Sequence, residues 1–87
     1  RLLTWSAAAN KDAGQPHGEA AAMAKLFASE TAMWGATRAI QMHGGLGVSQ
    51  DTPLAGMYMG ARTLRFADGP DAVHRMVVAR HELARLR

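Results

Sequence analysis

The chain has 87 residues, of which 48% are hydrophobic and 6% aromatic, and it contains no cysteine. This composition predicts one small globular domain rather than a disordered segment, and it excludes structural disulfides, thiolate zinc sites and thiol nucleophiles. The formal net charge is +3, but the basic residues are spread along the sequence, which favours a solvated helix face over a nucleic-acid-binding surface. No apolar run is long enough to predict a membrane span.

The first part of the chain predicts the end of a helix followed by a loop. Residues 1–12 carry a short apolar stripe that begins with Leu2, Leu3 and Trp5, at a spacing typical of one helix face. Residues 13–18 contain two glycines and a proline, which predicts a loop. The sequence starts with arginine rather than methionine, so we expect a piece of a larger polypeptide.

The strongest pattern runs from Glu19 to about His43, where large apolar residues recur at three- and four-residue spacing. This spacing predicts a long amphipathic helix of roughly 35 Å. Gly44 or Gly45 is expected to end it, because glycine adopts a positive φ at little steric cost. The helix is longer than so small a globule needs, so we expect it to pack on something outside this chain. Its apolar positions include Met23, Leu26, Phe27, Met33, Trp34 and Ile40.

Two further helices are predicted in the second half. Pro53 suits the first turn of a helix, with Asp51 or Thr52 as its N-cap, and this helix should give way near Leu64. A turn at residues 68–71 and a last helix follow, with arginines facing outward. The fold class is therefore all-α, a helical bundle of about four segments with no sheet. The apolar residues expected to face inward on the last helix are Val73, Met76, Val77 and Leu83.

Asp68 is the carboxylate of most chemical interest, because it precedes Gly69 and Pro70 at the entry to a helix. Spacing alone favours a structural interpretation, in which Asp68 or Asp71 caps free N–H groups of that helix. The alternative is a general base at a turn, whose pKa would have to rise from about 3.9 by desolvation. The histidines show no metal-ligand spacing, and the glycine cluster fits neither a Walker loop nor a Rossmann turn.

Nearly the whole chain resembles the C-terminal helical domain of the flavin-dependent acyl-CoA dehydrogenases. Residues 24–30 read Ala-Lys-Leu-Phe-Ala-Ser-Glu, as on the long helix of that family, and Pro53 stands where the family has a proline after its glycine motif. The resemblance implies that residues 1–87 are a C-terminal helical-bundle fragment of such an enzyme and are inactive alone. The family motif Gln-x-x-Gly-Gly-x-Gly is matched by Gln41, Gly44, Gly45 and Gly47.

By this resemblance, Asp68 and Gly69 take the place of the family's catalytic Glu-Gly pair. Asp68 would remove the α-proton of an acyl-CoA thioester while the β-hydrogen leaves as a hydride to FAD. Its backbone N–H would help hold the thioester carbonyl, and Gly69 would line the same pocket. Gln41, Gly44 and Gly45 would approach the adenine and pyrophosphate end of an FAD bound mainly by a neighbouring subunit.

The chain departs from the family pattern at the catalytic turn. The family usually has Glu-Gly-Thr, whereas this sequence has Asp-Gly-Pro at residues 68–70, so the base is one methylene shorter and a threonine contact to the flavin is lost. An aspartate base is also known in the related nitroalkane oxidases. A flavin oxidase acting on nitroalkanes or acyl-CoA is therefore an alternative, and a non-enzymatic helical interaction module is another.

The resemblance also implies partners. These are an acyl-CoA substrate, neighbouring subunits of a homodimer or homotetramer, and an electron acceptor such as an electron-transfer flavoprotein. Nucleic acid and membrane insertion are not expected. The enzyme would serve fatty acid oxidation, in the cytoplasm of a bacterium or in the mitochondrion or peroxisome of a eukaryote.

Overall fold

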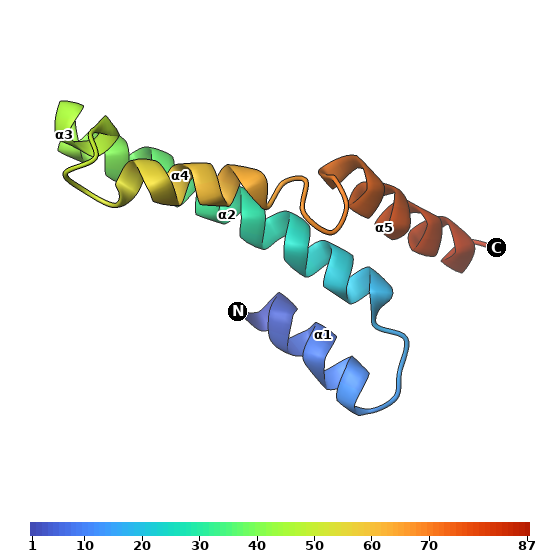
Figure 1. Ribbon diagram of the computed structural model, residues 1–87. Coiled ribbons are helices and arrows are strands. Elements are labelled where there is room, and N and C mark those ends of the chain that lie inside the picture. Colours follow the sequence, from blue (N-terminus) through green and yellow to red (C-terminus); the bar gives the residue numbers. More distant parts are fainter. The chain divides into compact units, whose positions relative to one another are not determined.

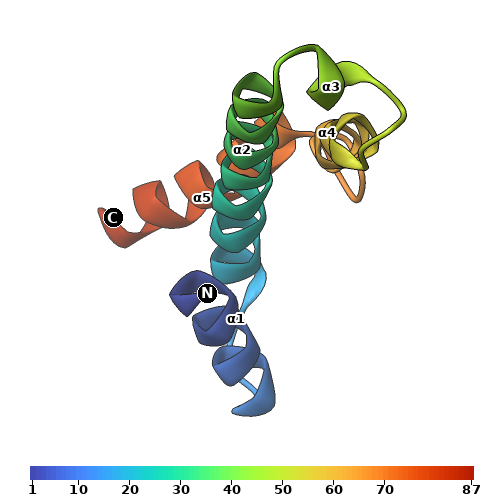
Figure 2. The same ribbon diagram turned by 90° about the vertical axis from the view of Figure 1, so that its left-hand side faces the viewer.

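The computed structural model describes residues 1–87 and contains five helices and no strand. The prediction of an all-α fold is confirmed, and the long helix is uninterrupted, as Figures 1 and 2 show. Each of the four predicted segments is present, and a short fifth helix was not foreseen. No helix has both the length and the apolar character that crossing a membrane would require. The helices are α1 (Leu2–Asp12), α2 (Gly18–His43), α3 (Gly45–Val48), α4 (Leu54–Thr63) and α5 (Asp71–Arg85).

The chain forms two compact units. The terminal unit combines residues 1–27 with residues 69–87, and the central unit comprises residues 28–68. Helix α2 passes through both, so its first part belongs to the terminal unit together with α1 and α5. The central unit holds the rest of α2 together with α3 and α4.

In the central unit, the glycine cluster ends α2 as predicted. Gly44 has φ +60°, a left-handed conformation that side chains with a Cβ rarely adopt and that stops the helix at His43. The chain then turns directly into α3, which packs backbone against backbone on α2. A Cβ placed on Gly47 would lie 2.8 Å from the carbonyl oxygen of Ile40. Only glycine therefore fits this position without a shift of the backbone.

The predicted side-chain caps of α4 are wrong. Pro53 itself is the N-cap residue, and no side chain caps the helix. The loop hydroxyls bond to the loop and to α3 instead: the N–H of Asp51 donates to Ser49 Oγ at 3.2 Å, and Thr52 Oγ1 donates to the Leu46 carbonyl at 3.4 Å. The hydroxyl of Thr52 therefore bonds to α3, and proline supplies helical φ and ψ without an N–H that needs a cap.

Very little of the apolar surface is covered within the chain. The buried residues are two alanines, one serine and Gly47, and no large side chain is fully buried. The prediction that the apolar face of α5 lies inward is wrong for this chain, because Val73, Met76 and Leu83 are 41%, 44% and 60% exposed. Alanine-rich helices bury little area against one another, so 87 residues do not cover these faces.

Candidate functional site

The turn between α4 and α5 has an unusual backbone. Asp68 has φ +54° and is the one residue other than glycine with a positive φ, and Gly69 follows with φ +108°. The turn itself was predicted at these residues and is confirmed. The left-handed conformation of Asp68 was not predicted, because aspartate only occasionally adopts it. Backbone strain of this kind concentrates at functional sites, which directs attention to this carboxylate.

Asp68 does not cap α5, contrary to the interpretation that spacing favoured. Pro70 is the N-cap residue with extended backbone geometry, no side chain caps the helix, and Asp71 is its first residue. The Asp68 side chain is exposed and makes no hydrogen bond or ion pair within the chain. The backbone N–H groups of Asp68 and Gly69 likewise donate to no acceptor in the chain. A carboxylate and two backbone donors are therefore available to a ligand at one turn.

In the terminal unit, side chains from α2 and α5 hold the next residue of this turn. Lys25 Nζ donates to the carbonyl oxygen of Gly69 at 2.7 Å and lies 3.3 Å from His74 Nε2, in a partly buried setting. The His74 ring occupies the side of Gly69 where a Cβ would point, 3.2 Å from that position. Sequence reasoning missed both residues. Lys25 was noticed only as part of a family-like segment, and nothing in its spacing links it to a turn 44 residues later.

The glycine-rich end of α2 offers a second accessible backbone surface. Gly44 and Gly45 are exposed, and a Cβ on either would meet no atom within 4 Å. Gln41 is exposed on the last turn of α2. These three residues precede α4 in the chain and Asp68 follows it, and α4 is a helix about 15 Å long. Figure 1 shows α3, which begins at the glycine-rich end of α2, beside one end of α4. Within this unit they form two separate places rather than one cluster.

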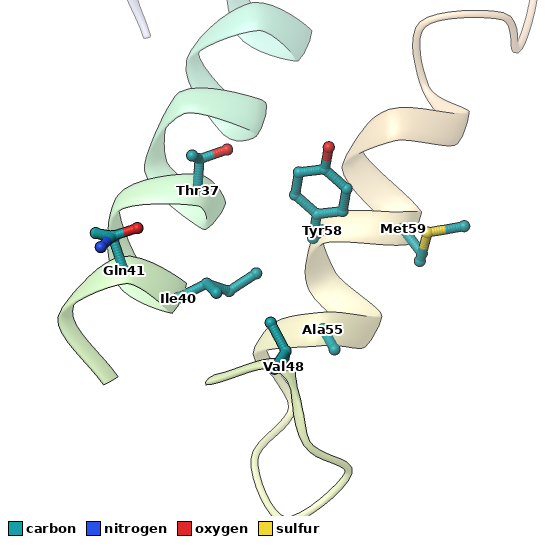
Figure 3. Close-up of a pocket in the computed structure, with 7 residues that line it drawn as sticks. All are labelled: Thr37, Ile40, Gln41, Val48, Ala55, Tyr58 and Met59. Carbon is teal, nitrogen blue, oxygen red and sulfur yellow. The ribbon is translucent and has the colours of Figure 1, made fainter. Parts of the chain in front are cut away.

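A largely apolar pocket lies between α2 and α4, with a volume of about 350 Å³. Figure 3 shows Ile40 from α2 and Tyr58 from α4 on the two sides of the space between the helices. Gln41 and Val48 also line it, so this pocket adjoins the glycine-rich end of α2. The sequence pattern did not predict this pocket, which depends on how the two helices pair.

The histidines do not gather into a metal site. No three histidine, aspartate or glutamate side chains lie close enough together to hold an ion. His43 Nδ1 lies 2.8 Å from the Ala39 carbonyl at the end of α2, and His17 Nδ1 lies 3.3 Å from the Gln15 carbonyl. Both contacts are local, so these two rings belong to a helix end and a loop.

Comparisons with known proteins agree with this architecture. The family model described as acyl-CoA dehydrogenase, C-terminal domain, matches residues 1–83. The chain is 52% identical over 88 residues to acyl-CoA dehydrogenase family member 11 of Rattus norvegicus, covering 95% of this chain and 11% of the relative. It thus spans only a small part of such a protein.

Solved structures show the same likeness. Butyryl-CoA dehydrogenase from Megasphaera elsdenii superposes with a TM-score of 0.92 at 36% identity, over 95% of this chain and 22% of that one. A chain in the structure of the electron transferring flavoprotein of Acidaminococcus fermentans gives the same TM-score at 41% identity, with the same coverage of 95% and 22%. These matches argue against a free-standing interaction module. The chain belongs to the acyl-CoA dehydrogenase family, as a C-terminal domain of that family.

Proposed function

We propose that this chain is the C-terminal domain of an FAD-dependent acyl-CoA dehydrogenase in which Asp68 removes the α-proton of an acyl-CoA thioester. The observation that carries the proposal is the Asp68 carboxylate, which is exposed, unpaired and set on a left-handed turn. By the resemblance, this position holds the family's catalytic base. A base kept free of partners within its own chain is ready to accept a proton from a ligand.

The backbone beside the carboxylate supports the same chemistry. Removing an α-proton places negative charge on the thioester oxygen, and that charge needs hydrogen-bond donors positioned in advance. The N–H of Asp68 donates to nothing within the chain, so it is available for this oxygen. The N–H of Gly69 also donates to nothing within the chain. One turn would thus provide both the base and the oxyanion donor.

The glycine-rich end of α2 fits the approach of a dinucleotide cofactor. The space over Gly44 and Gly45 is open, so their backbone can come close to a pyrophosphate or an adenine, and Gln41 carries an amide donor and acceptor. FAD, when bound, would accept the β-hydrogen of the substrate as a hydride. In this proposal the three residues contact the nucleotide end of an FAD held mainly by a neighbouring subunit.

The uncovered apolar faces support partner subunits. Seventeen large hydrophobic side chains are exposed, among them Trp5, Trp34 and Phe66, and apolar surface on this scale is typical of interfaces. We infer a homodimer or homotetramer that covers these faces. An electron-transfer flavoprotein is the proposed acceptor, and the similarity to a chain in the Acidaminococcus fermentans flavoprotein structure supports that choice.

The test is Asp68→Asn in the complete flavoprotein, with Asp51→Asn, an exposed loop aspartate, as the matched control. The amide keeps the shape of the side chain but does not accept a proton, so flavin reduction by acyl-CoA should fall by at least roughly 10²–10⁴-fold. Anaerobic stopped-flow absorbance measures that rate. Flavin content should match that of the control variant. Normal flavin bleaching in Asp68→Asn would remove Asp68 from the mechanism and overturn the proposal.

A flavin oxidase is the second candidate function, because the related nitroalkane oxidases also use an aspartate base. The two activities differ in what reoxidises the reduced flavin. Rapid oxygen uptake during turnover, with hydrogen peroxide as product and no need for an electron-transfer flavoprotein, would favour the oxidase. Slow reaction with oxygen together with fast transfer to the flavoprotein would favour the dehydrogenase.

A further inference from the structure

We propose that Lys25 is a positioning residue that holds the Asp68–Gly69 turn in its active conformation, with His74 as the second anchor. The inference rests on the proposed function only in naming what the turn is positioned for. Lys25 donates to the carbonyl oxygen of Gly69, an atom outside the proposed reaction, so its role is to act through the backbone of Gly69.

The contact that carries the inference is a charge-assisted hydrogen bond. Lys25 Nζ lies 2.7 Å from the Gly69 carbonyl oxygen and is partly buried. Hydrogen bonds from an ammonium group are shorter and about twice as strong as those between neutral groups, and partial burial protects this one from competition by water. It joins the first part of α2 to a turn 44 residues later, so it restrains the turn from outside its own sequence neighbourhood.

His74 completes the arrangement. An ammonium group has donors only, so a hydrogen bond across the 3.3 Å contact would run from Lys25 Nζ to His74 Nε2. The same ring packs where a Cβ on Gly69 would point. Glycine suits position 69 because its φ is +108°, and a Cβ there would also push the ring away by a few tenths of an ångström.

This anchoring matters because Gly69 is otherwise the most adaptable residue of the turn. Glycine samples positive and negative φ about equally, and a change at Gly69 would redirect the peptide that joins it to Asp68. The hydrogen bond from Lys25 to the Gly69 carbonyl restricts the backbone rotation of Gly69, the residue that directly follows Asp68. A displacement of a catalytic group by about 1 Å can lower a rate by roughly 10²-fold. Loss of the Lys25 contact should therefore slow proton removal by shifting the Asp68 turn, rather than by removing a contact with the substrate.

The experiment compares Lys25→Met with Lys11→Met in the complete flavoprotein. Methionine keeps the length of the side chain and removes its donors, and Lys11 is an exposed lysine of α1 without a side-chain partner. Two readouts are taken. Hydrogen–deuterium exchange measures the order of the turn with and without flavin. Anaerobic stopped-flow measures flavin reduction at saturating acyl-CoA, together with the dissociation constant of the substrate.

In Lys25→Met we expect peptides covering residues 66–74, where the amides of Phe66, Ala67, Val73 and His74 are hydrogen-bonded, to exchange several-fold faster and those covering residues 37–48 to stay unchanged. Flavin reduction should slow by roughly 10–100-fold, with flavin content and substrate affinity within about threefold of Lys11→Met. Unchanged exchange at the turn, or a reduction rate equal to that of Lys11→Met, would overturn the proposal. So would a rate loss matched by an equal loss of bound flavin, since that would indicate general destabilisation.

A second pair of variants decides the question if Lys25→Met does not fold. His74→Leu removes the second acceptor of Lys25 and leaves the Gly69 carbonyl, whereas His74→Gln retains an oxygen acceptor at this position. Slower flavin reduction and faster exchange at residues 66–74 in the leucine variant, with recovery in the glutamine variant, would support the anchoring role. Equal behaviour of the two would refute His74 as the second anchor and, with it, the proposal. If Asp68→Asn proves active, the proposed function fails, while the exchange measurements still test whether Lys25 orders the turn.

Discussion

Gly44 and Gly69 both lie in turns at positive φ, yet the two turns are stabilised in opposite ways. At the end of α2, Gly44 has φ +60° and the following Gly47 packs on the backbone of Ile40, so every partner lies within seven residues. At the entry to α5, Gly69 has φ +108° and its partners are Lys25 and His74, from two different helices. The first turn depends on local backbone geometry, whereas the second depends on tertiary contacts.

The difference matches the two proposed roles. The glycine-rich backbone at the end of α2 has open space beside it, which suits contact with a cofactor held by a neighbouring subunit. This turn needs no support from distant side chains. A turn that presents a catalytic carboxylate needs its geometry held to within a fraction of an ångström. Side-chain anchors from packed helices provide that, and Asp68 itself is left free of partners. Substitutions at the two turns should therefore have different consequences.

The largest effect on stability is expected from Gly69→Ala. Alanine would have to adopt φ +108° and place its Cβ 3.2 Å from His74 Nε2, so strain and crowding together should cost about 2–4 kcal/mol. Thermal unfolding of the complete protein measures this, and flavin reduction should slow as well. Gly44→Ala is the matched control, since its φ is +60° but its Cβ meets open space, and it should cost only about 1–2 kcal/mol. Equal losses would show that tertiary packing adds nothing at Gly69.

Gly47→Ala should have an intermediate effect. Its Cβ would lie 2.8 Å from the Ile40 carbonyl oxygen, which requires α3 to move away from α2, at a cost of about 1–3 kcal/mol. The displacement should also weaken flavin binding without changing the intrinsic rate of flavin reduction, because the turn at Asp68 is held elsewhere. Flavin titration and stopped-flow measurements separate the two. A slower reduction step with full flavin occupancy would contradict the independence of the two turns.

The smallest effect is expected from Arg85→Ala in the terminal unit. Arg85 pairs with Glu19 at 2.7 Å and with Glu82; the Arg85 side chain is 64% exposed and that of Glu19 is 12% exposed, so solvent screens the pair mainly from the arginine side. The loss should be about 1–2 kcal/mol, because the Glu19 carboxylate is left without its cation, measured as a shift in unfolding temperature against Arg87→Ala as control. A much larger loss, or a change in the rate of flavin reduction, would mean that this pair also supports the Asp68 turn.

Short-range features of the fold were predictable from the residues alone. The apolar spacing of residues 19–43 specified one long helix, and Gly44 specified its end, because both depend on neighbours within a turn or two. The turn at residues 68–71 followed from Gly69 and Pro70 for the same reason. The short helix α3 was missed, since four residues carry no measurable period. The cap of α4 was misassigned because proline itself took the N-cap position.

In the candidate site, too, the features that depend on sequence neighbours were predictable and those that depend on tertiary contacts were not. Composition and spacing placed Asp68 at a helix entry, and the motif resemblance named it as the base, but neither showed its left-handed φ or its lack of partners. The anchoring by Lys25 and His74 was invisible, because residues 44 and 49 positions apart come together only when α2 and α5 pack in the terminal unit.

The sequence by itself determined which segments are helical, where they end and which residue carries the candidate carboxylate. Those properties follow from the intrinsic conformations of glycine and proline and from a helical repeat of about 3.6 residues. Only the tertiary structure decided how the turn bearing Asp68 is held and that its carboxylate stays free. It also decided that the apolar face of α5 stays exposed within this chain. The physical reason is that a hydrogen bond or a buried surface needs two partners, and the sequence order of the partners does not specify their proximity in space.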